Sequence, residues 1–301
     1  MTITATLIVL LSALAHAGWN LFGKSVSPSG AFFWYCTLWG AVITLPVLVF
    51  YQSALTEFTP AIWWMVLLTG FFQATYLSSL AAAYRYGEMS IVYPLARSSP
   101  LIILLIGAVF LGTVDRISLA AVAGILLIVA GCMVLPMRHL KEFSWSNYLN
   151  LATLFALMAA ASTAGYSLVD DAATRWIRAL PGHGLSQGET ALLFVVLQAW
   201  STLVWLSVII ALQARERQLM PVLAANWRST LAAGVLILGT YGLVVWAMAY
   251  ADDVSYVVAF RQISIPIGVA MSWFFLKETL HGPKILGVVI VLIGLTLVVL
   301  G

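Results

Sequence analysis

Residues 282–300, GPKILGVVIVLIGLTLVVL, form a stretch in which Lys284 carries the only charge. A helix that crosses a lipid bilayer needs about 20 mostly apolar residues in sequence. The stretch therefore predicts a membrane-spanning α-helix, and the class of the whole chain depends on how often such stretches recur.

Nine other stretches of similar length and composition precede it. They cover residues 3–22, 31–51, 61–85, 90–111, 117–136, 147–169, 189–212, 229–250 and 254–276. A transmembrane β-barrel would instead show short segments of alternating hydrophobicity. The sequence thus predicts an all-α membrane protein with ten transmembrane helices and short loops. The longest predicted connection, residues 170–188, is either a solvated loop or holds a short interfacial helix around residues 174–178.

The amino-acid composition also indicates that the protein is surrounded by lipid. Of 301 residues, 62% are hydrophobic and 8% are charged, whereas about 25% of the residues of a soluble domain are charged. Lipid must therefore surround most of the chain. The few charges form no face suited to nucleic acid. The distribution of Lys and Arg over the predicted loops favours both termini outside the cytoplasm.

Two halves of the chain, residues 1–140 and 141–301, share a weak repeat. Matched positions are Ala17-Gly18-Trp19-Asn20-Leu21 with Ala164-Gly165-Tyr166-Ser167-Leu168, Phe110-Leu111 with Phe275-Leu276, and Gly124 and Gly131 with Gly287 and Gly294. Five helices cross the membrane an odd number of times, so the second half must be inverted relative to the first. Inverted repeats suit alternating access around a central site, which favours a transporter.

Corresponding helices of the two halves are interrupted by proline. The fourth contains YPLARSSP at residues 93–100, and the ninth contains FRQISIP at residues 260–266. Such interruptions at matched positions mark the binding site of many transporters. A charge at this depth costs at least about 2.5 kcal/mol on insertion scales and should face a cavity or a partner. We therefore expect Arg97, Arg261, Gln262 and Tyr93 to contact substrate; alternatively, the arginines bond to carbonyls that the prolines leave free.

The first predicted helix carries a polar stripe of His16, Asn20 and Lys24 at intervals of four, which places them on one face. Trp19 lies beside it, and Tyr166 occupies the matched place in the sixth helix. We expect His16, Trp19, Asn20 and Tyr166 to line the site. His16 is either a protonatable coupling group or a structural residue.

The acidic residues are all expected at or near helix ends, including Asp170. With arginines at depth and no carboxylate there, the substrate is expected to be anionic or zwitterionic, with a carboxylate, phosphate or phosphonate bound by arginine. A quaternary ammonium substrate remains an alternative because aromatic rings alone can hold such cations.

The residues HAGWNLFGK at 16–24, YPLAR at 93–97 and FLKET at 275–279, with Gly287 and Gly294, give the chain a family resemblance. It resembles the EamA-domain permeases of the drug/metabolite transporter superfamily over essentially its whole length. The first half departs from the pattern, because Gly112-Thr113 stands where the second half has Lys277-Glu278.

The resemblance implies a ten-helix secondary transporter of the inner (plasma) membrane that exports or exchanges a small metabolite without ATP. No Walker-type loop, metal-ligand cluster or nucleophile–base pair is present in the sequence, so we expect neither an enzyme nor a cofactor. Two alternatives from other classes are a lipid-linked sugar flippase and a membrane receptor or assembly partner that transports nothing. Proton coupling or exchange and a homodimer are left open.

Overall fold

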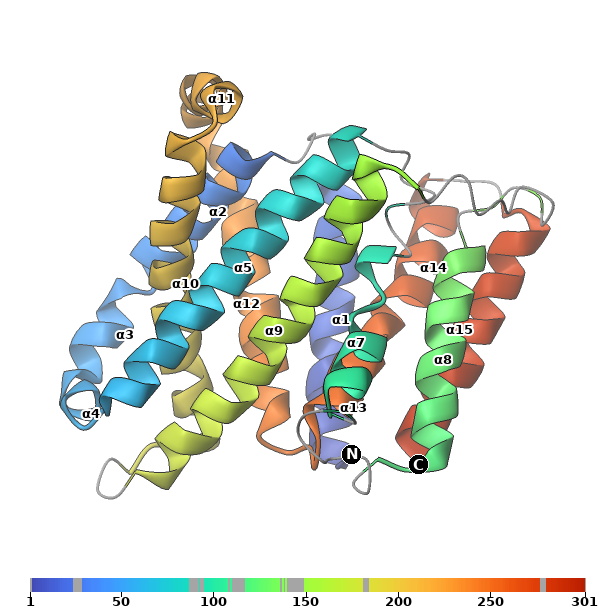
Figure 1. The fold of residues 1–301 in the computed structure, drawn as a ribbon, viewed down its shortest axis with the longest axis horizontal. Coiled ribbons are helices and arrows are strands. Elements are labelled where there is room, and N and C mark those ends of the chain that lie inside the picture. The colour runs from blue at the N-terminus through green and yellow to red at the C-terminus, as the bar shows by residue number, and fades with distance from the viewer. Residues whose placement is uncertain are drawn as a thin grey trace.

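The protein is described by a computed structural model that covers residues 2–23, 29–86, 92, 95–107, 109, 117–135, 137, 139, 149–180, 184–276 and 280–300, with the backbone alone at 18–23, 272, 275 and 276. Within these ranges the chain is helical (Figure 1). The longer helices are α1 (Ile3–Gly23), α2 (Gly30–Ile43), α5 (Pro60–Tyr86), α8 (Leu119–Val134), α9 (Leu151–Ala179), α10 (Gln187–Ala211), α12 (Trp227–Met248), α14 (Ser264–Leu276) and α15 (Gly282–Leu300). The shorter ones are α3 (Leu45–Phe50), α4 (Gln52–Thr56), α7 (Ser99–Ile106), α11 (Ala214–Ala225), α13 (Val254–Phe260) and the 3-10 helix η5 (Arg261–Ile263).

Each of the ten stretches predicted to cross the membrane contains helix. In the described part of the chain, six spans are long and apolar enough to cross a bilayer, and three shorter apolar helices accompany them. Large apolar side chains point outward, with Trp64 and Phe274 each 70% exposed. Such a surface fits lipid rather than water. Both ends of the chain lie at the same end of the bundle (Figure 1).

Side chains cap several of these helices. Ser186 and Glu189 form a reciprocal capping box at the start of α10, and the Asn150 side chain accepts a hydrogen bond from the Thr153 amide at the start of α9. The first amides of a helix have no partner inside it, so such caps fix where each helix begins.

The helix interruptions expected in the two halves are visible where the chain is described. Helix α13 gives way to η5 at Arg261, directly before Ser264 and Pro266. In the first half, Arg97 and Ser98 precede α7, which has a proline, Pro100, in its first turn. Proline cannot continue the backbone hydrogen bonds of the preceding turn, which explains why the helices break there.

The prediction of a connection over residues 170–188 is corrected, because helix α9 continues to Ala179. Asp171 and Arg175 pair on its outer face at 2.9 Å across one turn. Spacing of four residues places opposite charges side by side on a helix, which adds to its stability. Asp170 therefore lies well inside a helix rather than at its edge.

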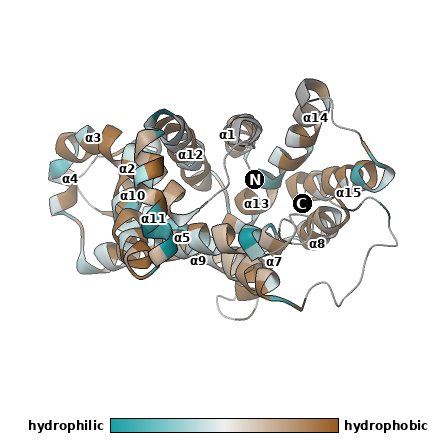
Figure 2. Ribbon diagram, turned by 90° about the horizontal axis from the view of Figure 1, so that it is seen from above, coloured by the Kyte–Doolittle hydropathy of each residue, from teal (hydrophilic) through white to brown (hydrophobic). Residues whose placement is uncertain are grey.

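Helices α8 and α15 pack through glycine. A Cβ atom on Gly124 would lie 2.5 Å from the carbonyl oxygen of Gly294, and one on Gly131 would lie 2.8 Å from that of Gly287. Only glycine permits this approach of two backbones, as in other helix pairs within membranes. The pair stands beside the rest of the bundle in Figures 1 and 2, and many of its residues are coloured as hydrophobic in Figure 2.

Helix α11 is held against the bundle by Glu216, which is 2% exposed. Its carboxylate accepts a hydrogen bond from the Ala31 amide at 3.0 Å, at the start of α2, and lies 3.5 Å from the Arg85 guanidinium near the end of α5. A carboxylate is favourable at the N-terminus of a helix, where free amides carry partial positive charge. Glu216 thus joins three helices at one end of the bundle.

Replacing Glu216 by alanine is expected to lower the free energy of unfolding by about 1–3 kcal/mol, because a buried amide loses its acceptor. Arg85 remains partly exposed and can reach water, so its charge adds little to the loss. Thermal unfolding of the detergent-purified protein measures the effect. Glu57→Ala, at an exposed position, is the control, and equal melting temperatures for the two variants would contradict the assignment.

Candidate functional site

Arg97, His16 and Gln262 meet inside the bundle. The guanidinium of Arg97 lies 3.2 Å from Nε2 of His16 and donates a long hydrogen bond of 3.4 Å to Oε1 of Gln262. Gln262 is 1% exposed, and its amide also donates to the Val258 carbonyl at 3.3 Å. The structure therefore joins the first helix with the interrupted helices of both halves.

The contact with Arg97 determines which nitrogen of His16 carries a proton. A guanidinium can only donate hydrogen bonds, so Nε2 of His16 must accept. The imidazole is then neutral, with its proton on Nδ1. This arrangement avoids placing two cations side by side, and it makes His16 a positioning partner of Arg97 in this conformation.

Arg261 starts the 3-10 segment η5 and is partly exposed. Its side chain forms no hydrogen bond or ion pair with any residue that the structure describes. Its charge acts on His16 and also on Tyr241 of α12. A guanidinium inside a membrane bundle must reach water or a ligand. Arg261 is therefore the basic side chain best placed to bind a substrate.

The remaining expected site residues are only partly placed. Tyr93 lies outside the described residues, and for Trp19 and Asn20 only the backbone of α1 is described. Tyr166 is placed in α9, 3% exposed. Its ring packs edge-on against Tyr76 at 5.8 Å and against Tyr241 at 5.5 Å, so it belongs to a group of three tyrosines.

A second polar cluster surrounds Asp170, which is 0% exposed. The hydroxyls of Thr69 and Tyr241 donate to its carboxylate, and the Gln198 amide lies 3.2 Å and 3.1 Å from its two oxygens. The same amide nitrogen lies 2.6 Å from the Thr69 hydroxyl. Helices α5, α10 and α12 therefore each supply one donor to a carboxylate on α9.

This cluster corrects the expectation that acidic residues lie only at helix ends. Helix α10 runs over residues 187–211, so Gln198 is one residue from its midpoint, and Asp170 lies at that depth. The sequence signal was present: Tyr166 and Asp170 are four residues apart and share a helix face. The prediction from hydropathy placed the end of this helix at residue 169, because an isolated aspartate is unfavourable in lipid.

The tyrosines connect the two clusters. Tyr241 donates to Asp170, packs against Tyr166 and feels the charge of Arg261. The tyrosine group is thus bound to the carboxylate of Asp170, and the charge of Arg261 reaches one of its members, Tyr241. Within the described part of the chain, no three His, Cys, Asp or Glu side chains gather as metal ligands.

Two family models match the sequence, one in each half. Residues 3–137 match the EamA-like transporter family, and residues 187–301 match a model described as Solute carrier family 35. The chain is a permease of the drug/metabolite transporter superfamily. Both matched families consist of transporters, so the permease is a multi-pass membrane transporter.

The fold of the permease also agrees with a solved structure, described only as "Crystal structure of protein". The two superpose with a TM-score of 0.72 at 18% sequence identity, over 100% of this chain and 98% of the other. At this identity the likeness shows the fold alone. None of the curated proteins compared matches the permease.

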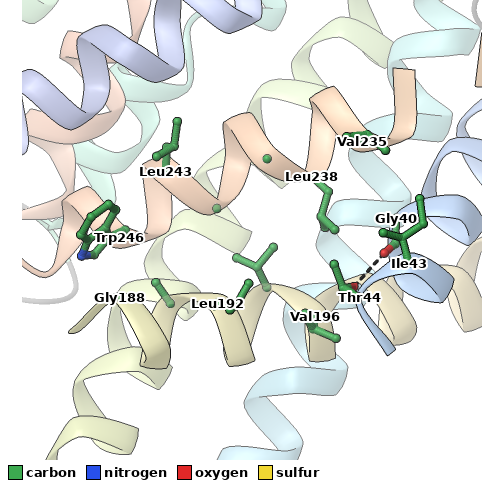
Figure 3. A pocket seen from close by; sticks show the side chains of 14 residues that line it. Gly40, Ile43, Thr44, Gly188, Leu192, Val196, Val235, Leu238, Leu243 and Trp246 are labelled. Atoms are coloured by element: carbon green, nitrogen blue, oxygen red, sulfur yellow. Dashed lines mark hydrogen bonds between the residues drawn. The ribbon is translucent and has the colours of Figure 1, made fainter. Parts of the chain in front are cut away.

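A cavity of about 360 Å³ in the permease lies between α2, α10 and α12 (Figure 3), and no residue of the two polar clusters lines it. Its wall includes Gly40, Gly188, Leu192, Leu238 and Trp246, and none of the fourteen lining residues is charged. Its wall therefore offers no charged side chain to an ionic substrate or to a charged lipid headgroup.

Proposed function

We propose that the permease carries a small zwitterionic metabolite across the inner (plasma) membrane, outward or in exchange, by alternating access. Its acidic group is bound by Arg97 and Arg261, and its amino group lies toward the tyrosines. The observation that carries this proposal is the pair of guanidiniums at matched helix interruptions. Charge-assisted hydrogen bonds from arginine suit carboxylate and phosphonate groups alike.

Alternating access needs two inverted halves, which we assign to residues 1–140 and 141–301. Arg97 and Gln262, which touch, are 165 residues apart, the same interval that separates Phe110 from its match Phe275. The repeat matches Gly124 with Gly287 and Gly131 with Gly294. The contact between Gly124 and Gly294 therefore corresponds to the contact between Gly287 and Gly131, and both contacts are present. Contacts of this kind support a pseudo-two-fold axis through the Arg97–Gln262 pair, where transporter sites lie.

The charge distribution favours a zwitterion over a simple anion. Tyr241 donates a hydrogen bond to Asp170 and also lies within reach of the charge of Arg261, so a carboxylate and a basic group both act on the tyrosine group. A cation over a tyrosine ring gains about 0.5–2 kcal/mol. A molecule with an acidic and an amino group therefore complements this region better than one with an acidic group alone.

The tyrosines and Asp170 also favour a second candidate, a quaternary ammonium or other cationic substrate. This function would leave the arginines as structural groups that tie the interrupted helices together. A lipid-linked sugar flippase is less well supported, since the cavity between α2, α10 and α12 lacks charged lining residues.

A thermal-shift comparison of matched compounds tests the proposal. Each common amino acid would be compared with its amide, which lacks the acid, and with its deaminated analogue, which lacks the amine. A ligand at 100 times its dissociation constant stabilises the fold by about 2.7 kcal/mol. We expect an intact zwitterion to raise the melting temperature and both analogues to lose most of this effect.

Trimethylated amino acids and choline complete the set. Stabilisation by choline and the amide, without stabilisation by the deaminated acid, would replace the proposed substrate class by a cationic one. Aminophosphonates would distinguish a phosphonate from a carboxylate as the acidic group.

A further inference from the structure

We propose that Asp170 is a reversible proton-binding site through which a proton gradient drives the permease. This inference rests on the proposed transport function and adds the coupling group. Of the two roles that the sequence leaves open for His16, coupling group or structural residue, its contact with Arg97 favours the structural one, because Nε2 accepts a hydrogen bond there.

The surroundings of Asp170 accept both forms of a carboxyl group. In the ionised form its oxygens receive hydrogen bonds from Thr69, Gln198 and Tyr241. In the protonated form the carboxyl O–H can donate to the Thr69 or Tyr241 oxygen, because a hydroxyl can rotate and act as donor or acceptor. The site therefore keeps its hydrogen bonds when a proton is gained or lost.

Opposing effects act on the charge of Asp170. Complete burial disfavours the charge, and in the described part of the chain no Lys, Arg or His lies within ion-pair distance of Asp170. Three donors directed at one carboxylate favour the charge. A permanent ion pair would abolish this balance.

The helices around Asp170 present few titratable groups to it. Helices α5 and α10 present Thr69 and Gln198, which do not titrate. Helix α12 presents Tyr241, which also feels Arg261, and the next residue on α9 is Asp171, paired with Arg175 on the outer face. Asp170 is thus the only carboxyl group described within this cluster.

A small cavity with several polar side chains in its wall lies beside this cluster. It measures about 40 Å³ and is lined in part by Gln73, Gln198, Thr202 and Tyr241. Oε1 of Gln73 and Oγ1 of Thr202 are buried and have no hydrogen-bond partner among the described residues. A cavity of this size with several polar partners can hold a water molecule, which would connect Tyr241 and Gln198 to the neighbouring helices.

Coupling to substrate follows from Tyr241. Where the protonated carboxyl donates to Tyr241, the Tyr241 hydroxyl must change its hydrogen bond, and the ring of Tyr241 packs on Tyr166 of α9. A proton on Asp170 therefore alters the contact between α9 and α12, two helices of the proposed substrate site.

Infrared spectroscopy of the reconstituted permease tests proton binding without any ligand. We expect the carbonyl band of a protonated, buried carboxyl to appear as the pH falls, to be absent from Asp170→Asn and to persist in Asp171→Asn. A band that does not titrate, or that persists in Asp170→Asn, would overturn the proposal. Should Asp170→Asn not fold, Tyr241→Phe provides a second variant, because it keeps the carboxyl and removes one hydrogen-bond donor. The carboxyl band of Tyr241→Phe should titrate at a higher pH than that of the wild type. An unchanged titration would count against the site.

Coupling is then tested in proteoliposomes with a radiolabelled mixture of the common amino acids. An imposed pH gradient should stimulate uptake by the wild type. Asp171→Asn, which changes the neighbouring carboxyl, should keep this stimulation, and Asp170→Asn should lose it. Exchange without any stimulation in the wild type would overturn coupling. If neither protein takes up the probe, the zwitterion assignment fails, whereas the infrared titration still decides whether Asp170 binds a proton.

Discussion

Replacing Arg261 by alanine is expected to weaken binding of the zwitterion by about 30-fold to several thousand-fold. Removing one partner of a buried, hydrogen-bonded charge pair costs about 2–5 kcal/mol, and every 1.4 kcal/mol is a factor of ten. The dissociation constant of the best ligand from the thermal-shift comparison, measured by titration calorimetry, gives the effect directly.

Arg261 is a sharper target than Arg97 because the two differ in their surroundings. Arg97 already contacts His16 and Gln262, so its removal also disturbs the link between the interrupted helices. Arg261 has no such contact with a described residue, and its loss should affect ligand binding more than folding.

Two further variants complete that experiment. Arg228→Ala removes an arginine that lies over the Trp227 ring at the start of α12 and should leave binding unchanged. Arg261→Lys keeps the charge but not the planar pair of donors, so it should recover only part of the affinity. Wild-type affinity in a folded Arg261→Ala protein would show that the substrate is not held by this arginine.

Two glycines of α12 are expected to respond in opposite ways to alanine. A Cβ atom on Gly234 would lie 3.0 Å from the carbonyl carbon of Cys36 in α2, and closer still to its oxygen, whereas one on Gly239 would meet nothing within 4 Å. Gly234→Ala must push two helix backbones apart, and such overpacking typically costs about 1–3 kcal/mol.

Gly239→Ala adds a side chain where there is space, and alanine is favoured over glycine within a helix by about 0.5–1 kcal/mol. The melting temperature should therefore fall for Gly234→Ala and be equal to or above that of the wild type for Gly239→Ala. Because both substitutions add the same methyl group to the same helix, a similar change in both would show that the approach of α2 and α12 does not limit stability.

The two polar clusters show how neighbouring helices decide what an intramembrane residue does. Arg97 and Gln262 were expected at the site because each lies at a proline interruption, and the structure places them in contact. Asp170 was assigned to a helix end, although it lies at the centre of four helices. All three are polar side chains in apolar stretches of sequence, and the fold decides which partners each of them receives.

The tyrosines illustrate the same limit. Tyr166 was grouped with His16 and Trp19 because it matches Trp19 in the repeat. Its ring packs with Tyr76 and Tyr241, and the side chain of Trp19 lies outside the described residues. A repeat indicates which helices correspond, but the neighbours of a side chain also depend on residues, such as Tyr241, that have no special signal in the sequence.

The sequence by itself determined the helical membrane class, the location of the apolar helices and the matched interruptions at residues 93–100 and 260–266. These follow from local properties, since hydropathy over about 20 residues and the presence of proline act within one segment. Only the tertiary structure decided that Asp170 is buried, that α9 continues to Ala179 and that His16 accepts from Arg97. Each of these depends on donors brought from distant parts of the chain: Thr69 and Asp170 are 101 residues apart, and His16 and Arg97 are 81 apart. The energy that makes a buried charge tolerable comes from such partners, and no single segment contains them.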